Sequence, residues 1–273
     1  MTAAISIPHV IHYCWFGGSP LGDKEQACIE SWRKFLPDYE IKRWDESNWN
    51  VHCCDYVSEA YAAGKWAFVS DYARFDILWR EGGLYFDTDV ELARPIDDIL
   101  ERGPFMGFET DWSPDDGCGT VAPGLGLAAG AGHPFYKAVL DSYCGDHFIT
   151  SNGDLNETTI VQRTTEILLA QGLKSEPGIQ EVDGIWIYPS EYFNPKNFFT
   201  GQLHLTENTR SIHHFSMSWL SEESKYEHEV GKWLLNHRIE KGIASKMAAI
   251  ATILRYQDWS RISRKLTSLA KRE

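Results

Sequence analysis

Basic residues are scarce in this sequence of 273 residues. Lysine and arginine together number 26 against 39 aspartates and glutamates, which leaves a formal net charge of -13 at pH 7. Because neutralisation of phosphates by Lys and Arg dominates affinity for nucleic acid, this balance argues against a nucleic-acid partner. A smaller anion stays admissible where a metal ion and a few basic groups screen it locally.

Three further patterns are absent from the sequence. No apolar run approaches the roughly 20 residues that a membrane-spanning helix needs. The six cysteines show no Cys-x-x-Cys spacing, and the first residues lack the charged and apolar regions of a signal peptide. We therefore expect reduced thiols, no zinc ribbon and a cytoplasmic location.

Aromatic residues, in contrast, are plentiful, with 11 Trp, 12 Tyr and 13 Phe. Most should pack in the interior, but such rings also stack on bases and sugars. The length suits one large domain, or one and a half, with an ample core. Without an internal repeat or a low-complexity linker, residues 1–236 are predicted to form one domain, followed by an extension over 237–273.

Strand and helix patterns alternate along the first third of the chain. The apolar run 7–16 predicts a buried strand, and helices and strands follow in the order β-α-β-α before the next buried strand at 84–86. This order predicts an α/β fold with a mostly parallel central sheet flanked by helices. The glycine-rich segment 104–132 predicts tight strands and a mobile loop. The remaining predicted helices are 23–35, more than one helix between 55 and 80, 134–143 and 157–170, and the remaining strands are 39–44, 185–188 and 211–215.

The C-terminal segment 241–273 has a different charge. It holds eight basic and two acidic residues, and apolar residues recur in it at helical spacing, namely Met247, Ile250, Ile253 and Leu254. A basic amphipathic helix of this kind can lie on an anionic membrane surface. The alternative is a helix that docks on the protein body with its basic face in water.

The most informative stretch runs from Ser70 to Glu91. Aromatic residues with helical spacing lead to Gly82 and Gly83, which can end a helix without a Cβ penalty. A short buried strand then delivers Asp87 and Asp89, and because side chains alternate across a strand, both would leave it on the same side. Hard cations often use one or two carboxylates together with substrate phosphates, so the pair predicts half of a Mn²⁺ or Mg²⁺ site that a nucleotide completes. Taken alone, Asp-x-Asp is a weak motif and is also common in solvated turns.

Several motifs in order carry a family resemblance. They are Ile-Pro-His-Val-Ile-His-Tyr-Cys-Trp-Phe-Gly-Gly at 7–18, Ser-Asp-x-x-Arg at 70–74, Gly-Gly-x-Tyr-x-Asp-x-Asp at 82–89 and His-His-Phe-Ser-Met-Ser-Trp at 213–219. Together they resemble glycosyltransferase family 32, the DXD sugar transferases that include capsular-polysaccharide and Och1-like enzymes and are related to glucosylating bacterial toxins. The resemblance covers about residues 5–220. It implies a GT-A type fold, a nucleotide-sugar donor, a divalent metal and transfer with retention.

The resemblance also implies roles for individual residues. Trp15 would stack on the donor base, with the backbone of Tyr13 and Phe16 close to the nucleotide, and the alternative for Trp15 is a core residue at a strand end. Asp71 and Arg74 would grip sugar hydroxyls and phosphate, whereas an exposed pair at this spacing is usually a weak ion pair. The implied donor-binding and catalytic residues further along the chain are Tyr85, Asp87 and Asp89.

At the C-terminal motif, His213 resembles a third metal ligand beside Asp87 and Asp89. His214 is the competing choice, because neighbouring residues of a strand face opposite ways. Ser218 and Trp219 would lie in a loop that closes over the donor. The family often carries a Thr-Gly-Pro-like segment near residue 156 that this chain lacks, so Asn156 or Glu157 is our prediction for the residue beside the donor sugar, with a helix N-cap as the alternative for Asn156.

These expectations define one predicted function and two alternatives. The predicted function is transfer of a hexose from a UDP- or GDP-sugar to a saccharide or lipid-linked oligosaccharide acceptor in glycan or capsular-polysaccharide synthesis, at the inner face of the membrane if the C-terminal helix binds it. A metal-dependent phosphohydrolase would also use two aspartates. A carbohydrate-binding protein without activity would also be rich in Trp.

Overall fold

A computed structural model gives the structure of this chain, and it describes residues 6–114, 117, 119–217 and 220–257. Contacts divide the chain into two compact units. The first comprises residues 1–196 and 204–214, and the second comprises 197–203 and 215–273. The domain boundary predicted at residue 236 falls inside the second unit, between its two helices.

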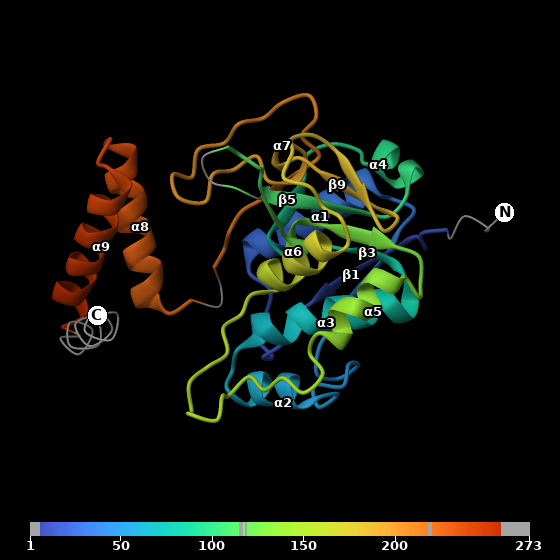
Figure 1. Cartoon of the computed structure of the whole chain (residues 1–273), viewed down its shortest axis with the longest axis horizontal. Coiled ribbons are helices and arrows are strands. Elements are labelled where there is room, and N and C mark those ends of the chain that lie inside the picture. The colour runs from blue at the N-terminus through green and yellow to red at the C-terminus, as the bar shows by residue number, and fades with distance from the viewer. Residues whose placement is uncertain (1–5, 115–116, 118, 218–219, 258–273) are drawn as a thin grey trace. The chain divides into compact units, whose positions relative to one another are not determined.

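The first unit is built on a mixed sheet (Figure 1). Its strand order is β2-β1-β3-β7-β5-β9-β8, with β6 paired to β5. The parallel pairs are β1 with β2, β1 with β3 and β5 with β9, and the other pairs of this sheet are antiparallel. The strand bounds are Val10–Cys14 (β1), Glu40–Trp44 (β2), Gly83–Tyr85 (β3), Phe105–Thr110 (β5), Thr120–Val121 (β6), Leu127–Ala129 (β7), Gln180–Val182 (β8) and Ile185–Tyr188 (β9).

These pairings mean that β1, β2, β3, β5 and β9 point in one direction, while β6, β7 and β8 point in the other. The predicted α/β class with flanking helices is confirmed, but the sheet is more mixed than the alternation predicted. The reason is that β7 returns antiparallel between β3 and β5 without a crossover helix.

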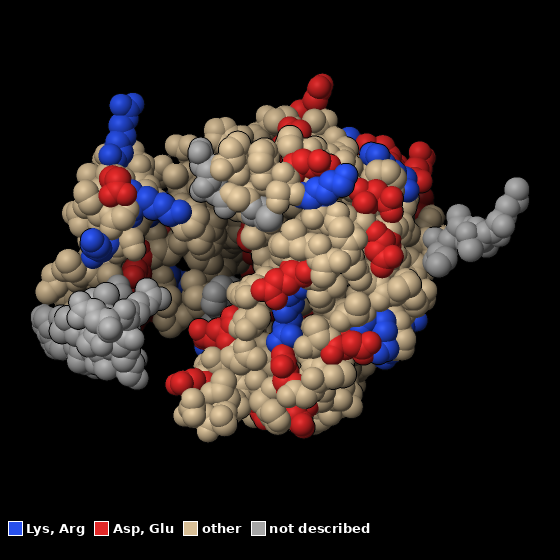
Figure 2. Space-filling view, viewed as in Figure 1, with Lys and Arg blue, Asp and Glu red and all other residues tan. Residues whose placement is uncertain are grey.

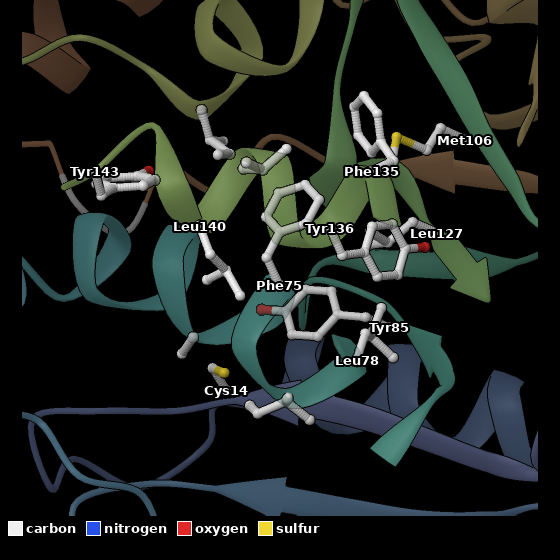
Figure 3. Close-up of a cluster of buried hydrophobic side chains, with 14 of the residues drawn as sticks. Cys14, Phe75, Leu78, Tyr85, Met106, Leu127, Phe135, Tyr136, Leu140 and Tyr143 are labelled. Carbon is white, nitrogen blue, oxygen red and sulfur yellow. The ribbon is translucent and has the colours of Figure 1, made fainter. Parts of the chain in front are cut away.

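Two clusters of buried side chains cover the two faces of the sheet. On one face, Phe75 and Leu78 of a helix meet Tyr85 of β3 and Tyr136 of a second helix (Figure 3). On the other face, Trp32 packs against strand residues. The helices are Asp23–Phe35 (α1), Asp55–Ala62 (α2), Trp66–Glu81 (α3), Asp97–Arg102 (α4), Pro134–Asp141 (α5), Ile160–Ala170 (α6) and Ser190–Phe193 (α7), with a 3-10 turn at Pro123–Leu125 (η1).

Gly82 ends α3 as predicted, with a positive φ of 68° and a ψ of -166°. This combination lies in a region that essentially only glycine adopts. The sharp change of direction lets β3 begin at once, and its Leu84 and Tyr85 pair with Ile11 and His12 of β1. The helix that carries Asp71 and Arg74 is thereby held directly beside the strand that leads to Asp87.

A two-stranded antiparallel sheet pairs β4 (Val90–Leu92) with β10 (Ser211–His213). The turn between β3 and β4 contains Asp87 and Asp89, and the amide of Val90 donates to the carbonyl of Asp87 at 3.0 Å. The pairing therefore fixes β10, which lies more than a hundred residues later in the sequence, beside Asp87 and Asp89.

The second unit contains α8 (Glu222–Asn236) and α9 (Lys241–Tyr256). The side chain of Ser221 caps α8 by accepting from the amide of Ser224, and Glu240 caps α9 by accepting from the amides of Gly242 and Ile243. The helical C-terminal region is thus confirmed. Among the helices that the structure describes, none combines the length and hydropathy needed to cross a bilayer.

Candidate active site

Three segments come to one edge of the sheet. Because β1, β3 and β5 run in the same direction, their carboxyl ends share an edge, and open α/β sheets bind ligands there. Trp15 follows β1, Asp87 follows β3, and Glu109 lies near the end of β5. The sheet topology therefore gathers the predicted donor ring and the predicted acids in one region.

The centre of the site is a buried guanidinium that joins two carboxylates. Nη2 of Arg74 lies 2.8 Å from Oδ1 of Asp71 and 3.2 Å from Oδ1 of Asp87. Tyr85 donates its hydroxyl to Oδ1 of Asp87 at 3.1 Å. The Arg74 side chain is only 4% exposed, so these are not the solvated ion pairs of a helix surface.

Burial dominates the electrostatics of this group. It raises the pKa of Asp71 to about 7, against the opposing effect of Arg74. It also raises the pKa of Asp87, which Arg74 again opposes. Burial by itself lowers the pKa of Arg74, but Asp87, Tyr85 and Asp71 outweigh it, so the guanidinium stays charged. Two acids share one cation, and the site can accept further positive charge.

Asp89 lies with His213, as the pairing of β4 and β10 dictates. The amide of His214 donates to the carbonyl of Asp89 at 2.9 Å, and Nε2 of His213 lies 3.1 Å from Oδ1 of Asp89. Both side chains are about one-sixth exposed, at 16% for His213 and 15% for Asp89. Burial lowers the pKa of His213, but Asp89, Asp87 and Glu109 together outweigh it, so the pKa of His213 is above its ordinary value.

The two adjacent histidines face different acids. His214 places Nε2 2.8 Å from Oε2 of Glu91, and its side chain is more exposed than that of His213. His213 is therefore the histidine beside Asp89. Its assignment as a metal ligand stays a prediction.

The sequence suggested that Asp87 and Asp89 continue the strand, but they do not. The strand ends at Tyr85, and the two acids occupy the turn that follows. They still interact electrostatically, because the negative charge of Asp89 acts on Asp87. The turn, and not strand alternation, brings the carboxylates together.

The donor set fits a hard divalent cation that a diphosphate brings with it. Two carboxylates and an imidazole lie in one neighbourhood, and oxygen ligands suit Mn²⁺ and Mg²⁺. Among the residues that the structure describes, however, no three His, Cys, Asp or Glu side chains form a ready-made metal cluster. Asp87 is turned toward Arg74, and Asp89 toward His213. Metal binding by Asp87, Asp89 and His213 stays a prediction.

Trp15 is half-buried, and its indole Nε1 donates to the carbonyl of Ser19 at 2.6 Å. Its neighbours have side chains in the core on opposite faces of the sheet. Tyr13 packs edge-on against Trp32, and Phe16 packs against Trp49. Both side chains are buried, and the contact of their backbone with a nucleotide stays a prediction.

Three other predictions have different outcomes. Asn156 is held in its own loop, because its side chain donates to the carbonyl of His147 and accepts from the amide of Thr158. Helix α6 begins later than predicted and is capped by Thr159, so Asn156 is not its N-cap. Glu157 is exposed. A sugar-binding role for either residue stays a prediction, and Ser218 and Trp219 lie outside the described residues.

The structure adds a glycine to the site. The carbonyl of Gly124 accepts from the amide of Asp87 at 3.2 Å, and a Cβ on Gly124 would lie 2.1 Å from Oδ2 of Asp87. The sequence predicted tight strands and a mobile loop here. The predicted strands are present as β5, β6 and β7, and residues 121–130 are all buried.

Two charged residues were missed by sequence reasoning. Glu109 is deeply set, burial raises its pKa, and it acts electrostatically on His213. An acid at the end of a buried strand is the same signal that singled out Asp87, so Glu109 could have been found. Arg163 of α6 is buried over the ring of Tyr143 at 4.1 Å and acts on Asp71. Nothing in the local pattern around Arg163 indicates this.

Residues 22–106 match the family model described as "Glycosyltransferase sugar-binding region containing DXD motif". Asp71, Arg74, Asp87 and Asp89 all fall inside the match. These residues are thus similar to the sugar-binding region of DXD glycosyltransferases. The family resemblance predicted from the sequence is confirmed.

Two curated relatives come from Schizosaccharomyces pombe (strain 972 / ATCC 24843). This chain is 26% identical over 155 residues to "Inositol phosphoceramide mannosyltransferase 1", covering 49% of the chain and 42% of the relative. It is 29% identical over 139 residues to "Inositol phosphoceramide mannosyltransferase 3", covering 50% of the chain and 36% of the relative. The chain therefore spans less than half the length of these relatives. A solved structure, "PaToxG Glycosyltransferase", is similar with 19% identity and a TM-score of 0.42, covering 61% of this chain and 70% of that one.

Proposed function

We propose that this protein is a retaining, metal-dependent glycosyltransferase with a GT-A type domain. It moves a hexose from a UDP- or GDP-sugar to a saccharide or lipid-linked acceptor in glycan synthesis at the cytoplasmic side of the membrane. The observation that carries the proposal is the Arg74 guanidinium buried between Asp71 and Asp87, inside the DXD region and beside the turn that holds Asp89.

The residues divide the work of binding the donor. Trp15 stacks on the base, because it follows β1 at the edge of the sheet where the acids lie. Asp71 and Arg74 hold a sugar hydroxyl and a phosphate oxygen. Their mutual ion pair keeps both side chains in one rotamer before the donor arrives, so little ordering is needed on binding.

Asp87, Asp89 and His213 are the residues that would hold Mn²⁺ or Mg²⁺ together with the diphosphate. A bound cation supplies Lewis acidity, which stabilises the negative charge on the leaving nucleoside diphosphate. Arg74 adds a fixed positive charge that needs no reorganisation during the reaction. The acids that surround it favour positive charge at the anomeric carbon as the glycosidic bond breaks.

Retention follows if the acceptor hydroxyl attacks the face from which the diphosphate departs. The hydroxyl oxygen forms the new bond to the anomeric carbon, the bond to the phosphate oxygen breaks, and the departing phosphate takes the hydroxyl proton. No side chain is required as a nucleophile. Exclusion of water by the surrounding buried residues suppresses hydrolysis.

The relatives give the first substrates to test. They are named as mannosyltransferases that act on inositol phosphoceramide. A mannosyl nucleotide and a glycolipid that carries an inositol phosphate are therefore our first donor and acceptor, with UDP-hexoses and oligosaccharides as the comparison.

The test is release of UDP or GDP from a sugar nucleotide by the purified protein in Mn²⁺. We expect release that EDTA abolishes, that Asp89→Ala reduces by about 100-fold or more, and that NMR of the product shows to retain the donor anomer. Asp141→Ala is the matched control, because Asp141 is an exposed acid paired with Lys137. If the Asp89→Ala protein and the EDTA-treated protein both turn over as fast as the unchanged protein in Mn²⁺, the proposal is contradicted.

The same experiment separates the alternatives. A metal-dependent phosphohydrolase would release inorganic phosphate from phosphate esters and leave the glycosidic bond intact. A carbohydrate-binding protein would bind glycans equally in EDTA and in Mn²⁺, without turnover.

A further inference from the structure

Helix α9 exposes a continuous stripe of large apolar side chains. The four residues recur at intervals of four, three and four, so they lie along one side of the helix. Their exposed fractions are 53% for Ile243, 45% for Met247, 58% for Ile250 and 61% for Leu254. Single exposed apolar residues are ordinary, but a row of four along one helix marks an interaction surface.

The opposite side of α9 already has its partner. Ala244, Ala248 and Thr252 are almost fully buried, and α9 packs on α8. Gly231 of α8 lies opposite Ala248, because a Cβ on Gly231 would be 3.8 Å from that of Ala248. Small residues thus close the pair of helices, and the stripe is not needed to hold it together.

Charge indicates what covers the stripe. From Lys241 to residue 257 the helix carries three basic residues and no acid, and 241–273 as a whole carry eight basic and two acidic residues. The full chain has a net charge of -13, so basic residues are concentrated where the stripe lies. Figure 2 shows Lys and Arg side chains on the visible surface of the α8 and α9 pair. The local excess of basic residues attracts an anionic lipid surface to this helix, although the chain as a whole is acidic.

We propose that Ile243, Met247, Ile250 and Leu254 form the contact of this protein with an anionic lipid bilayer. The helix lies in the plane of the interface, with the stripe in the boundary between headgroups and acyl chains and with Lys246 at the phosphates. This is a property of the second unit, so it holds whether or not the proposed transferase activity does.

The experiment is co-sedimentation of the full chain with vesicles of phosphatidylcholine containing 30% phosphatidylglycerol, against phosphatidylcholine alone. We expect binding to the mixed vesicles to be at least about tenfold stronger, because several basic residues each contribute near the surface. Ile250→Glu with Leu254→Glu should weaken binding to the mixed vesicles by at least about tenfold. Leu205→Glu is the matched control, since Leu205 is 57% exposed in the first unit, and it should bind like the unchanged protein.

A second arm tests the charge. Lys246→Glu should weaken binding, and added salt should weaken it further through screening. Far-UV circular dichroism of each variant confirms that the helices are intact. Equal binding by the double Glu variant overturns the proposal. So does a lipid-free dimer, seen by sedimentation, that the double Glu variant dissociates, because a second copy would then cover the stripe.

Discussion

The indole Nε1 of Trp44 donates a hydrogen bond to Nδ1 of His12 at 3.0 Å, in the interior of the sheet. On the other side of the ring, Nε2 of His12 lies 2.9 Å from the carbonyl of Gly82. These partners fix one neutral tautomer, with the proton on Nε2. A second proton on Nδ1 would face the indole N-H, so charging this histidine breaks the hydrogen bond.

Stability should therefore fall in mild acid. Burial lowers the pKa of His12 from 6.5 to about 4. The unfolded chain takes up a proton below pH 6.5 and the folded chain does not, so this contribution is complete above pH 6.5 and is lost as the pH falls toward 4. The expected loss is about 1.4 kcal/mol of unfolding free energy per pH unit in that window.

Urea unfolding between pH 4.5 and 7.5 measures this loss, and His12→Gln supplies the control. The glutamine amide can accept from Trp44 and donate to Gly82 without titrating, so its stability should depend less steeply on pH. Parallel pH curves for the two proteins would contradict the assignment.

Gly82→Ala should be strongly destabilising. The backbone at Gly82 has a φ of 68° and a ψ of -166°, and a Cβ there would lie 2.6 Å from the amide nitrogen of Ala131. Conformational strain and a clash with backbone add, for a loss of about 3 kcal/mol or more in unfolding free energy. Gly145→Ala is the control with a similar φ of 79° and open space around it, so it isolates the strain at about 1 kcal/mol. Thermal unfolding of both variants gives the comparison.

Local pattern was sufficient for much of the fold. Helix α1 has the predicted bounds, and α3 ends at the predicted Gly82, because apolar periodicity and a terminal glycine are both local signals. The short elements α4, α7 and β8 were not predicted, since three to six residues hold too little periodicity. The antiparallel position of β7 between β3 and β5 was not predicted, because strand order is a property of the whole sheet.

The candidate site also has a part that local sequence predicts and a part that it does not. The Asp71 and Arg74 pair and the Asp87 turn lie within one motif, and their proximity follows from the tight link between α3 and β3. The contacts of Gly124 and Arg163 with this group join segments far apart in the sequence, and no local signal marks them. The choice between His213 and His214 needed the register of β10 on β4.

Gly124→Ala should disable the site without unfolding the protein. Its Cβ would lie 2.1 Å from Oδ2 of Asp87 and 3.2 Å from Nη1 of Arg74, so the carboxylate must turn away. A misplacement of this size can reduce turnover about 100-fold. Gly22→Ala is a matched control, because its Cβ would meet the carboxylate of Glu25 at 2.6 Å on the surface, where that side chain can swing into solvent. Turnover and melting temperature of both variants are the measurements, and normal turnover by Gly124→Ala would contradict the role of Asp87.

Arg74 should matter both for stability and for turnover, and two substitutions separate the effects. Arg74→Ala leaves Asp71 and Asp87 buried without their shared cation, which should cost about 3 kcal/mol of unfolding free energy. Arg74→Lys restores a positive charge, so part of that stability should return, but a single ammonium cannot reproduce the fork between two carboxylates. Both variants should lose most nucleoside diphosphate release.

Arg80→Ala on the same helix is the control for this pair of substitutions. The Arg80 side chain is 45% exposed and pairs with Asp76, so its removal should change the unfolding free energy by less than about 1 kcal/mol and leave turnover intact. Urea unfolding and nucleotide release are measured on the same preparations. Full turnover by Arg74→Lys would mean that any positive charge suffices at this position, and the bridging geometry would then have no part in holding the donor.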